Sequence, residues 1–405
     1  MADLRDDPID SDTTAAAGDL DAQPSQPPQP HVPTETTPAP SAERARVLLS
    51  SHPVVDGHNS LAPTLLRRRG AGHSHDLEQG ESSLDTDLPR LRAGALGAQF
   101  WSLQVDSLQV ADDAADTDGA VSTTLELIDL VRDLIASCPD TLRLALGAGD
   151  LADARNYGRV ASLLGPVSGR AMGDSLATLR AFHFLGVRVL ALAGARWADD
   201  GLTRFGQEAV REMNRLGVVV DLTGACDETA RATFAVTKAP AMFSHGDGDV
   251  TDEIMTLLRA NSGVCMVSFA PGPTTRDARA TARDARATAR DARATARDAR
   301  APSVSAVADR VERVRDVAGP QCVGLSGTYG REAEAPRTLG LEDPSCYPHL
   351  ITELLDRGWD DTEITDLTWG NAARVLRDTE FLARAAQGRR PASMATIEEL
   401  DAPRR

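Results

Sequence analysis

Short apolar runs alternate with amphipathic segments along most of this chain, from about Ala42 onward. Eight of these runs have the length of buried strands, and several segments between them, such as Phe205–Leu216 and Val304–Val317, carry apolar residues at helical spacing. The alternation predicts βα units that build a parallel sheet. The predicted strands are Val54–Asp56, Ala98–Val105, Ala161–Val167, Val187–Leu192, Val218–Leu222, Ala241–Ser244, Val264–Phe269 and Cys322–Leu325.

Eight βα units are the number that closes a TIM-type barrel, so we expect an α/β protein with one (β/α)8 barrel over residues 43–390. Leu125–Ile135 is predicted to be an additional helix, and Leu350–Thr379 to form two C-terminal helices. Residues 391–405 are predicted to be a C-terminal tail.

Two segments differ in composition from the predicted barrel. Residues 1–42 are rich in Pro, Asp, Thr and Ala and nearly free of large apolar side chains, which predicts a disordered acidic tail. Residues 274–301 repeat T-x-R-D-A-R-A four times, with Ala as the only apolar residue. Because this repeat has no apolar seam for a coiled coil, we interpret it as a low-complexity insert in a loop. A solvated helix that binds a partner is the alternative.

Charge and composition limit the classes of partner. The net charge of -17 and the pI of about 4.9 argue against nucleic acid and anionic membranes as partners. The first residues lack the apolar segment of a signal peptide, no apolar run reaches transmembrane length, and we therefore expect a cytoplasmic protein. Five scattered cysteines include no C-x-x-C pair and are expected to be buried reduced thiols.

Six motifs follow one another in order along the chain. They are VVDGHN at Val54–Asn59, GAQFWS at Gly97–Ser102, GLTRFGQEAVREMNRLGVVVDL at Gly201–Leu222, APAMFSHG at Ala239–Gly246, VADRVERVRDVAG at Val307–Gly319 and GLEDPSCYPHLITELLDRGW at Gly340–Trp359. In this order they resemble the membrane (renal) dipeptidase family of zinc metallopeptidases, and in particular its actinobacterial members. The resemblance extends from about Ala42 to the end of the chain, apart from the repeat.

The resemblance implies a (β/α)8 barrel, in agreement with the strand pattern, and hydrolysis of dipeptides, including those with a C-terminal D-residue. It also implies two zinc ions and a possible homodimer. Two close cations lower the pKa of a bridging water and polarise the scissile carbonyl group. Such a site needs imidazole and carboxylate ligands at the C-terminal ends of several strands, including one carboxylate that bridges both metals.

Only two of the five metal-ligand positions implied by the resemblance keep their ligand, namely His58 after the first strand and His245 in the FSHG motif. Ser60 stands where an Asp ligand is expected, and Gly224 stands at the histidine of the fifth strand. Val167 falls at the bridging glutamate. Glycine and valine side chains offer no lone pair, and a neutral serine hydroxyl is a poor zinc ligand. Residues 161–173 contain no Glu or Asp, so a small shift does not recover the bridge.

The positions that the family uses for substrate and catalysis are also replaced. Gly194 stands at the histidine that contacts the substrate, and Thr328 stands at the catalytic aspartate of the eighth strand. The arginine that holds the substrate carboxylate falls in a deletion between Gly248 and Asp249. Zinc is therefore expected to bind weakly or not at all, although the family uses it.

These replacements lead to three hypotheses. The first is a catalytically inactive homologue that keeps the barrel and binds a dipeptide-like small molecule. The second is a divergent metallo-dipeptidase with one zinc held by His58, His245 and either Asp247 or Cys226. The third is a metal-independent enzyme or small-molecule binder that uses the emptied pocket.

Other candidate residues have simpler interpretations. Asp56 and Asp221 are interpreted as strand-end residues without a metal role, and Cys226 as a small buried residue at the start of a helix. His73 and His75 form a His-x-His pair that we assign to a solvated loop, with a weak metal contact as the alternative. No G-x-S-x-G elbow or Gly-rich phosphate loop occurs in the chain.

Overall fold

The computed structural model describes residues 40–69, 77–80, 83–104, 117–246, 250–270, 302–333 and 335–402. Most of the predicted N-terminal tail (1–42) and all of the predicted repeat insert (274–301) lie outside the described residues. The same holds for His73, His75 and Asp247.

The described strands form one parallel sheet that closes on itself. Neighbouring strands follow the order β2-β1-β9-β8-β7-β6-β5-β4, and β2 also pairs with β4. This pairing, in which Ala98 lies opposite Ala161 and Trp101 opposite Leu164, turns the sheet into an eight-stranded barrel. The barrel strands are β1 (Val54–Asn59), β2 (Leu96–Leu103), β4 (Val160–Ser168), β5 (Val189–Ala191), β6 (Val219–Asp221), β7 (Met242–Gly246), β8 (Val264–Ser268) and β9 (Val323–Ser326). The predicted (β/α)8 fold is confirmed.

One strand was not predicted from the sequence. Strand β3 (Leu142–Leu144) pairs with the beginning of β4, where Leu142 lies opposite Val160. Strands β3 and β5 pair with the same edge of β4, β3 near its beginning and β5 near its end. Strand β3 therefore extends the sheet but is not one of the eight strands that close the barrel. Three residues are too few to show a strand periodicity, and this explains why the pattern of the sequence did not reveal β3.

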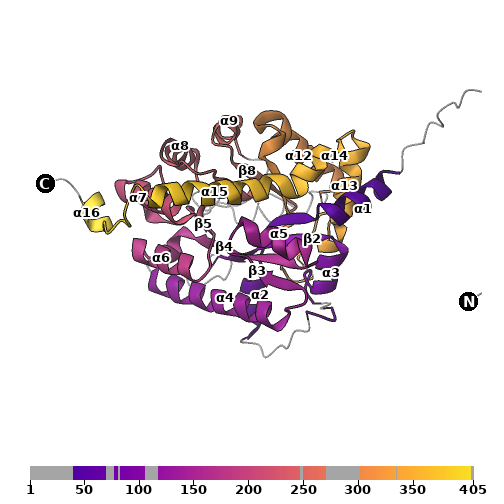
Figure 1. The fold of residues 1–405 in the computed structure, drawn as a ribbon, viewed down its shortest axis with the longest axis horizontal. Coiled ribbons are helices and arrows are strands. Elements are labelled where there is room, and N and C mark those ends of the chain that lie inside the picture. Colours follow the sequence, from indigo (N-terminus) through magenta and orange to yellow (C-terminus); the bar gives the residue numbers. More distant parts are fainter. Residues whose placement is uncertain are drawn as a thin grey trace, which may run out of the picture. The chain divides into compact units, whose positions relative to one another are not determined.

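Helices join successive strands, as expected for βα units, and Figure 1 shows them around the sheet. The predicted helix Leu125–Ile135 is the middle of a longer helix, α4. Leu350–Thr379 forms two helical segments, as predicted: α13, and then a continuous run of α14, a π-helical turn at Asp366–Gly370 and α15. The main helices are α1 (Ser41–Ser51), α2 (Leu61–Arg69), α3 (Leu88–Ala93), α4 (Thr117–Ser137), α5 (Ala148–Asn156), α6 (Leu176–Phe184), α7 (Arg204–Leu216), α8 (Asp227–Val236), α9 (Asp252–Ala260), α12 (Val304–Ala318), α13 (Tyr347–Asp356), α14 (Asp361–Thr365), α15 (Asn371–Gln387) and α16 (Ile397–Asp401).

The barrel interior is filled by apolar side chains, and α15 closes its N-terminal end. Asn371, at the start of α15, donates from Nδ2 to the carbonyl oxygen of Val323, the first residue of β9, at 2.9 Å. Val375 and Leu376 of α15 join the cluster of apolar side chains that the strands contribute. The opposite end of the barrel, where the strands terminate, is therefore the end available for a site. The strand members of this cluster include Val55, Phe100, Leu163, Val189, Val219, Met242, Val264 and Met266.

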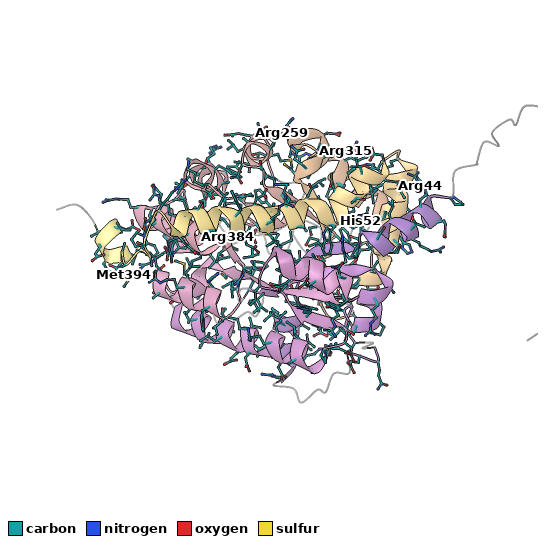
Figure 2. All side chains as sticks on the ribbon, viewed as in Figure 1. Arg44, His52, Arg259, Arg315, Arg384 and Met394 are labelled. Carbon is teal, nitrogen blue, oxygen red and sulfur yellow. The ribbon has the colours of Figure 1, made fainter. Side chains whose placement is uncertain are left out.

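Charged side chains cover the outer faces of the surrounding helices. Figure 2 shows Arg259 on α9, Arg315 on α12 and Arg384 on α15. No helix in the described ranges combines the length and apolar composition needed to cross a membrane.

The buried carboxylate of Glu212 on α7 connects two helices to the C-terminal segment. It accepts hydrogen bonds from Arg215 on the same helix at 2.8 Å and from Arg180 on α6 at 3.1 Å, and its second oxygen accepts from the Ser393 amide at 3.4 Å. Burial alone raises the pKa of Glu212, but the bonds from Arg215 and Arg180 outweigh it and lower the pKa below its ordinary value. The contact of Ser393 with Glu212 thus shows that the chain beyond residue 390, the predicted end of the barrel, still packs against α7.

Replacing this carboxylate is expected to weaken the fold. Glu212→Gln keeps the shape of the side chain but removes the charge that both arginines face, and it should lower the free energy of unfolding by about 1.5–3 kcal/mol. Urea denaturation at pH 7 measures the change. Glu253→Gln, which removes an exposed carboxylate paired with Arg231 at 2.7 Å, is the matched control and should leave stability unchanged within error.

The same variant should change how stability depends on pH. Because the pKa of Glu212 is lower in the folded chain than the ordinary 4.5, its stabilisation is present above pH 4.5 and is lost as the pH falls through the folded value. The difference in unfolding free energy between the wild type and Glu212→Gln should therefore shrink on acidification below pH 4.5. A difference that stays constant down to pH 3 would contradict this assignment.

Candidate functional site

The C-terminal ends of the barrel strands bring the predicted site positions to one rim. His58 lies near the end of β1 and His245 near the end of β7, and Thr328 follows β9 by two residues. Gly194 follows β5, and Gly224 follows β6. In parallel barrels this rim is where side chains from different strands converge.

The two retained histidines are in contact. Their ring centroids are 4.2 Å apart, with an angle of 49° between the ring planes. Gly57 allows this approach, because a Cβ atom at that position would lie 2.5 Å from the Ser244 carbonyl oxygen and 2.8 Å from Met266 Cβ. Strand β1 therefore approaches β7 and β8 closely at Gly57 because this residue has no side chain.

A buried carboxylate orients His245 through a serine. Asp221 Oδ2 accepts from the Ser244 hydroxyl at 2.6 Å, and the Ser244 Oγ lies 3.0 Å from His245 Nδ1. Asp221 Oδ1 accepts from the Thr223 amide and hydroxyl and from the Ser244 amide. Together with the bond from the Ser244 hydroxyl, the carboxylate accepts four hydrogen bonds. These bonds tie the end of β6 to β7 and fix the direction of the His245 ring.

This arrangement selects one tautomer of His245. The Ser244 hydroxyl donates its one hydrogen to Asp221 Oδ2. Ser244 Oγ then acts as the acceptor for His245 Nδ1–H, and Nε2 keeps its lone pair.

The ring of His58 is held on one nitrogen only. Its Nε2 lies 3.0 Å from Ser60 Oγ, whereas its buried Nδ1 has no hydrogen-bond partner within the described part of the chain. The backbone below the ring is fixed by Asp56, whose Oδ1 accepts from the His58 amide at 3.1 Å and from the Gly327 amide at 2.9 Å. Asp56 therefore joins the ends of β1 and β9 from inside the barrel wall.

Burial determines the protonation of this region. Burial raises the pKa of Asp56 to about 7, and hydrogen bonds from the His58 and Gly327 amides only partly oppose the shift. Burial also lowers the pKa of His58, and the neighbouring His245 and Arg331 lower it further. For His245 burial is again the main cause of a lowered pKa, and Asp221 opposes it. Both imidazoles are accordingly neutral at pH 7.

The positions where the resemblance predicted a bridging glutamate, a substrate-contacting histidine and a histidine ligand differ in their structure here. Val167 is fully buried in β4, opposite Leu103 of β2 and Leu190 of β5, among apolar side chains. Gly194 and Gly224 adopt φ of 85° and 74°, in the left-handed region that favours glycine. A histidine at either glycine would require a strained backbone.

Thr328 and Arg331 are joined by two hydrogen bonds. Thr328 has φ of 53°, an uncommon value for a β-branched residue. Its hydroxyl donates to the Gly327 carbonyl oxygen at 2.7 Å, and Arg331 donates to the Thr328 carbonyl oxygen at 2.9 Å and to its Oγ1 at 3.2 Å. A guanidinium group therefore lies at the rim beside Thr328, the residue that the resemblance placed at the catalytic aspartate.

Comparison with known proteins shows the family to which this chain belongs. The family model described as membrane dipeptidase (peptidase family M19) matches residues 42–390. The chain belongs to the membrane dipeptidase family. It is 34% identical to dipeptidase 3 of Mus musculus over 373 residues, covering 86% of this chain and 69% of that protein. It is also 34% identical to dipeptidase aclJ of Aspergillus oryzae over 365 residues, covering 84% and 81%.

Solved structures of dipeptidases share the fold. The probable dipeptidase PvdM of Pseudomonas aeruginosa aligns with a TM-score of 0.68 at 17% identity, covering 85% of this chain and 99% of that one. A metallopeptidase of Rhodobacter sphaeroides, solved with a phosphinate mimic of the dipeptide L-Ala-D-Ala, aligns with a TM-score of 0.65 at 20% identity, covering 81% and 99%. The barrel of this chain is thus the barrel of these dipeptidases.

The residues at the rim do not fit the two zinc ions of the membrane dipeptidase family. The described rim offers two neutral imidazoles, of which His58 is hydrogen-bonded to Ser60 through Nε2. It offers no carboxylate at the bridging position, where Val167 is sealed among apolar neighbours. Tight zinc sites use three or four protein ligands, and a dinuclear site needs negative charge between the cations.

Cys226 does not complete a site with the histidines, contrary to one alternative drawn from the sequence. Its thiol lies 3.4 Å from the Asp199 carbonyl oxygen and 3.2 Å from Thr229 Oγ1, at the start of α8. It is also half-buried rather than buried, because this N-terminal helix position faces outward. Within the described ranges, one group of three potential ligands lies close together, formed by Asp200, Cys226 and Glu228. Both carboxylates are exposed, so this group is an ordinary acidic surface.

Several residues that shape the site escaped prediction from the sequence. Ser244 lies directly before His245 and carries the bond to Asp221, but a serine beside a histidine has no distinctive spacing. Arg331 belongs to the GTYGR segment used to place Thr328, and its charge at a strand end was the available clue. Asp85, which binds the backbone of that segment, comes from a loop without a pattern.

Removing the Ser244 hydroxyl should change the tautomer of His245. In the wild type we expect His245 to carry its proton on Nδ1, and in Ser244→Ala the Nδ1 atom loses its acceptor, so the Nε2–H form should increase. The ¹⁵N chemical shifts of the imidazole nitrogens at pH 8 distinguish the two forms. Ser162→Ala, in β4, is the matched buried-serine control and should leave the His245 shifts unchanged. Identical tautomers in the wild type and Ser244→Ala would refute the hydrogen bond from His245 Nδ1–H to Ser244 Oγ.

Proposed function

We propose that this chain is a catalytically inactive member of the membrane dipeptidase family, which keeps the barrel rim as a binding site for a dipeptide-like small molecule. The observation that carries the proposal is Val167, a fully buried apolar side chain where the family has its bridging carboxylate. The loss of carboxylates at Ser60 and Thr328 supports the same conclusion.

The proposal follows from the electrostatics of two close cations. Divalent ions about 3.5–4 Å apart repel strongly, and protein sites offset the repulsion with negative ligands. The ligands that remain here, His58 and His245, are neutral, and Arg331 adds positive charge close to both. Without metal, neither water activation nor polarisation of the substrate carbonyl is available to the chain.

Elemental analysis and a turnover assay test the proposal together. Protein purified without chelator should contain less than one zinc per chain and should not release amino acids from L-Ala-D-Ala above the background of a His58→Ala/His245→Ala variant. Losing one transition-state contact typically costs about 2.7–4 kcal/mol, and this chain lacks several. About two zinc ions per chain with zinc-dependent turnover would overturn the proposal. One zinc with slow turnover would instead support the divergent single-metal dipeptidase.

The homodimer and the cytoplasmic location expected from the sequence remain predictions. Neither is needed for the proposed binding role, which depends on the rim of a single barrel.

A further inference from the structure

The guanidinium group of Arg331 is fixed at the rim by its own neighbours. Nε donates to the Thr328 carbonyl oxygen at 2.9 Å, and Nη2 donates to Thr328 Oγ1 at 3.2 Å. The Arg331 amide donates to Asp85 Oδ1 at 2.9 Å, so both ends of the residue are anchored. Nη1 makes no hydrogen bond to any residue that the structure describes, and Nη2 keeps a second hydrogen.

The charge of Arg331 is not neutralised by the nearest acid. Asp85 uses one oxygen for the amides of Gly330 and Arg331, and its other oxygen forms an ion pair with Arg337 at 2.9 Å. Asp85 thus pairs with the guanidinium group of Arg337 and contacts Arg331 only through its backbone amide, which leaves the positive charge of Arg331 in excess. Across the described ranges, no carboxylate forms an ion pair with Arg331.

The remaining groups near the rim do not compensate for this cation. Asp221 directs both oxygens to donors in the barrel wall. Asp56 Oδ1 accepts from two backbone amides, and its buried Oδ2 has no hydrogen-bond partner among the described residues, Arg331 included. The Arg331 side chain is only partly exposed, and burial lowers its pKa. A partly buried cation without a counter-ion is unfavourable, and an anion at the rim would relieve this cost.

We infer that the rim binds a small monocarboxylate at Arg331, in the region beside His58 and His245 where the membrane dipeptidase family holds its metals. The inference rests on the proposed absence of zinc. A carboxylate fits the unused Nη1 and Nη2 hydrogens of Arg331, because arginine binds carboxylates through two parallel N–H bonds. A monoanion matches the single excess charge, whereas a phosphate dianion would leave one negative charge without a partner.

A binding experiment with acetate tests this site directly. The wild-type chain, treated with chelator and labelled with ¹⁵N-histidine, is titrated with acetate while the His58 and His245 resonances are followed. We expect saturable shifts in the wild type and at least tenfold weaker binding in Arg331→Gln, because each charge-assisted bond is lost. Arg231→Gln, which removes a surface arginine that is ion-paired with Glu228, is the matched control and should bind acetate as the wild type does.

Further ligands and variants make the result specific. Methylammonium should produce no saturable shift, and phosphate should bind more weakly than acetate. Arg331→Lys keeps the charge without the planar group and should bind acetate with intermediate affinity, which also tests the site if Arg331→Gln fails to fold. Equal acetate affinity in the wild type, Arg331→Gln and Arg331→Lys would overturn the inference, as would tighter binding of phosphate than of acetate.

A zinc titration separates this inference from the proposed function. Removing the cation should raise the affinity for Zn²⁺ about tenfold in Arg331→Gln relative to the wild type. If purified wild-type protein holds two zinc ions, the proposed function fails whatever acetate does. If it lacks zinc and acetate does not bind, the proposed function stands and the inference about Arg331 fails.

Discussion

The pairing of β2 with β4 closes the parallel sheet, and the geometry of the rim depends on that closure. Closure places the ends of β1, β6, β7 and β9 on one circle, although they are separated by long stretches of sequence. Within this circle, Gly57 permits β1 to approach β7 so closely that His58 and His245 meet. A side chain larger than hydrogen at Gly57 would separate the two rings and the strands that carry them.

The rim keeps the carboxylates that support its backbone, while the positions that would hold metal carry residues without charge. Asp56 ties β1 to β9, and Asp221 ties β6 to β7, in each case through hydrogen bonds to backbone amides. These bonds maintain the barrel whether or not a metal is bound. The fold therefore does not depend on metal ligands, since packing and these strand-end hydrogen bonds come from the chain itself.

The strands of the barrel could be predicted from the sequence because the signal is local: an apolar run of strand length remains visible wherever it lies. Strand β3 was missed because Leu142–Leu144 is too short for a pattern. The convergence of His58 and His245 on one rim followed from strand order, but the link through Ser244 did not, since it depends on a hydroxyl direction. The unpaired state of Arg331 depends on Arg337 pairing with Asp85, a contact across 252 positions that no local pattern reveals.

The left-handed backbone at Gly194 and Gly224 limits the side chains that the turns after β5 and β6 accept. A histidine at either position would strain its turn. Under the proposed absence of zinc, building a zinc site on this barrel would therefore need several substitutions together with a change of backbone, because Val167 is also buried among apolar side chains.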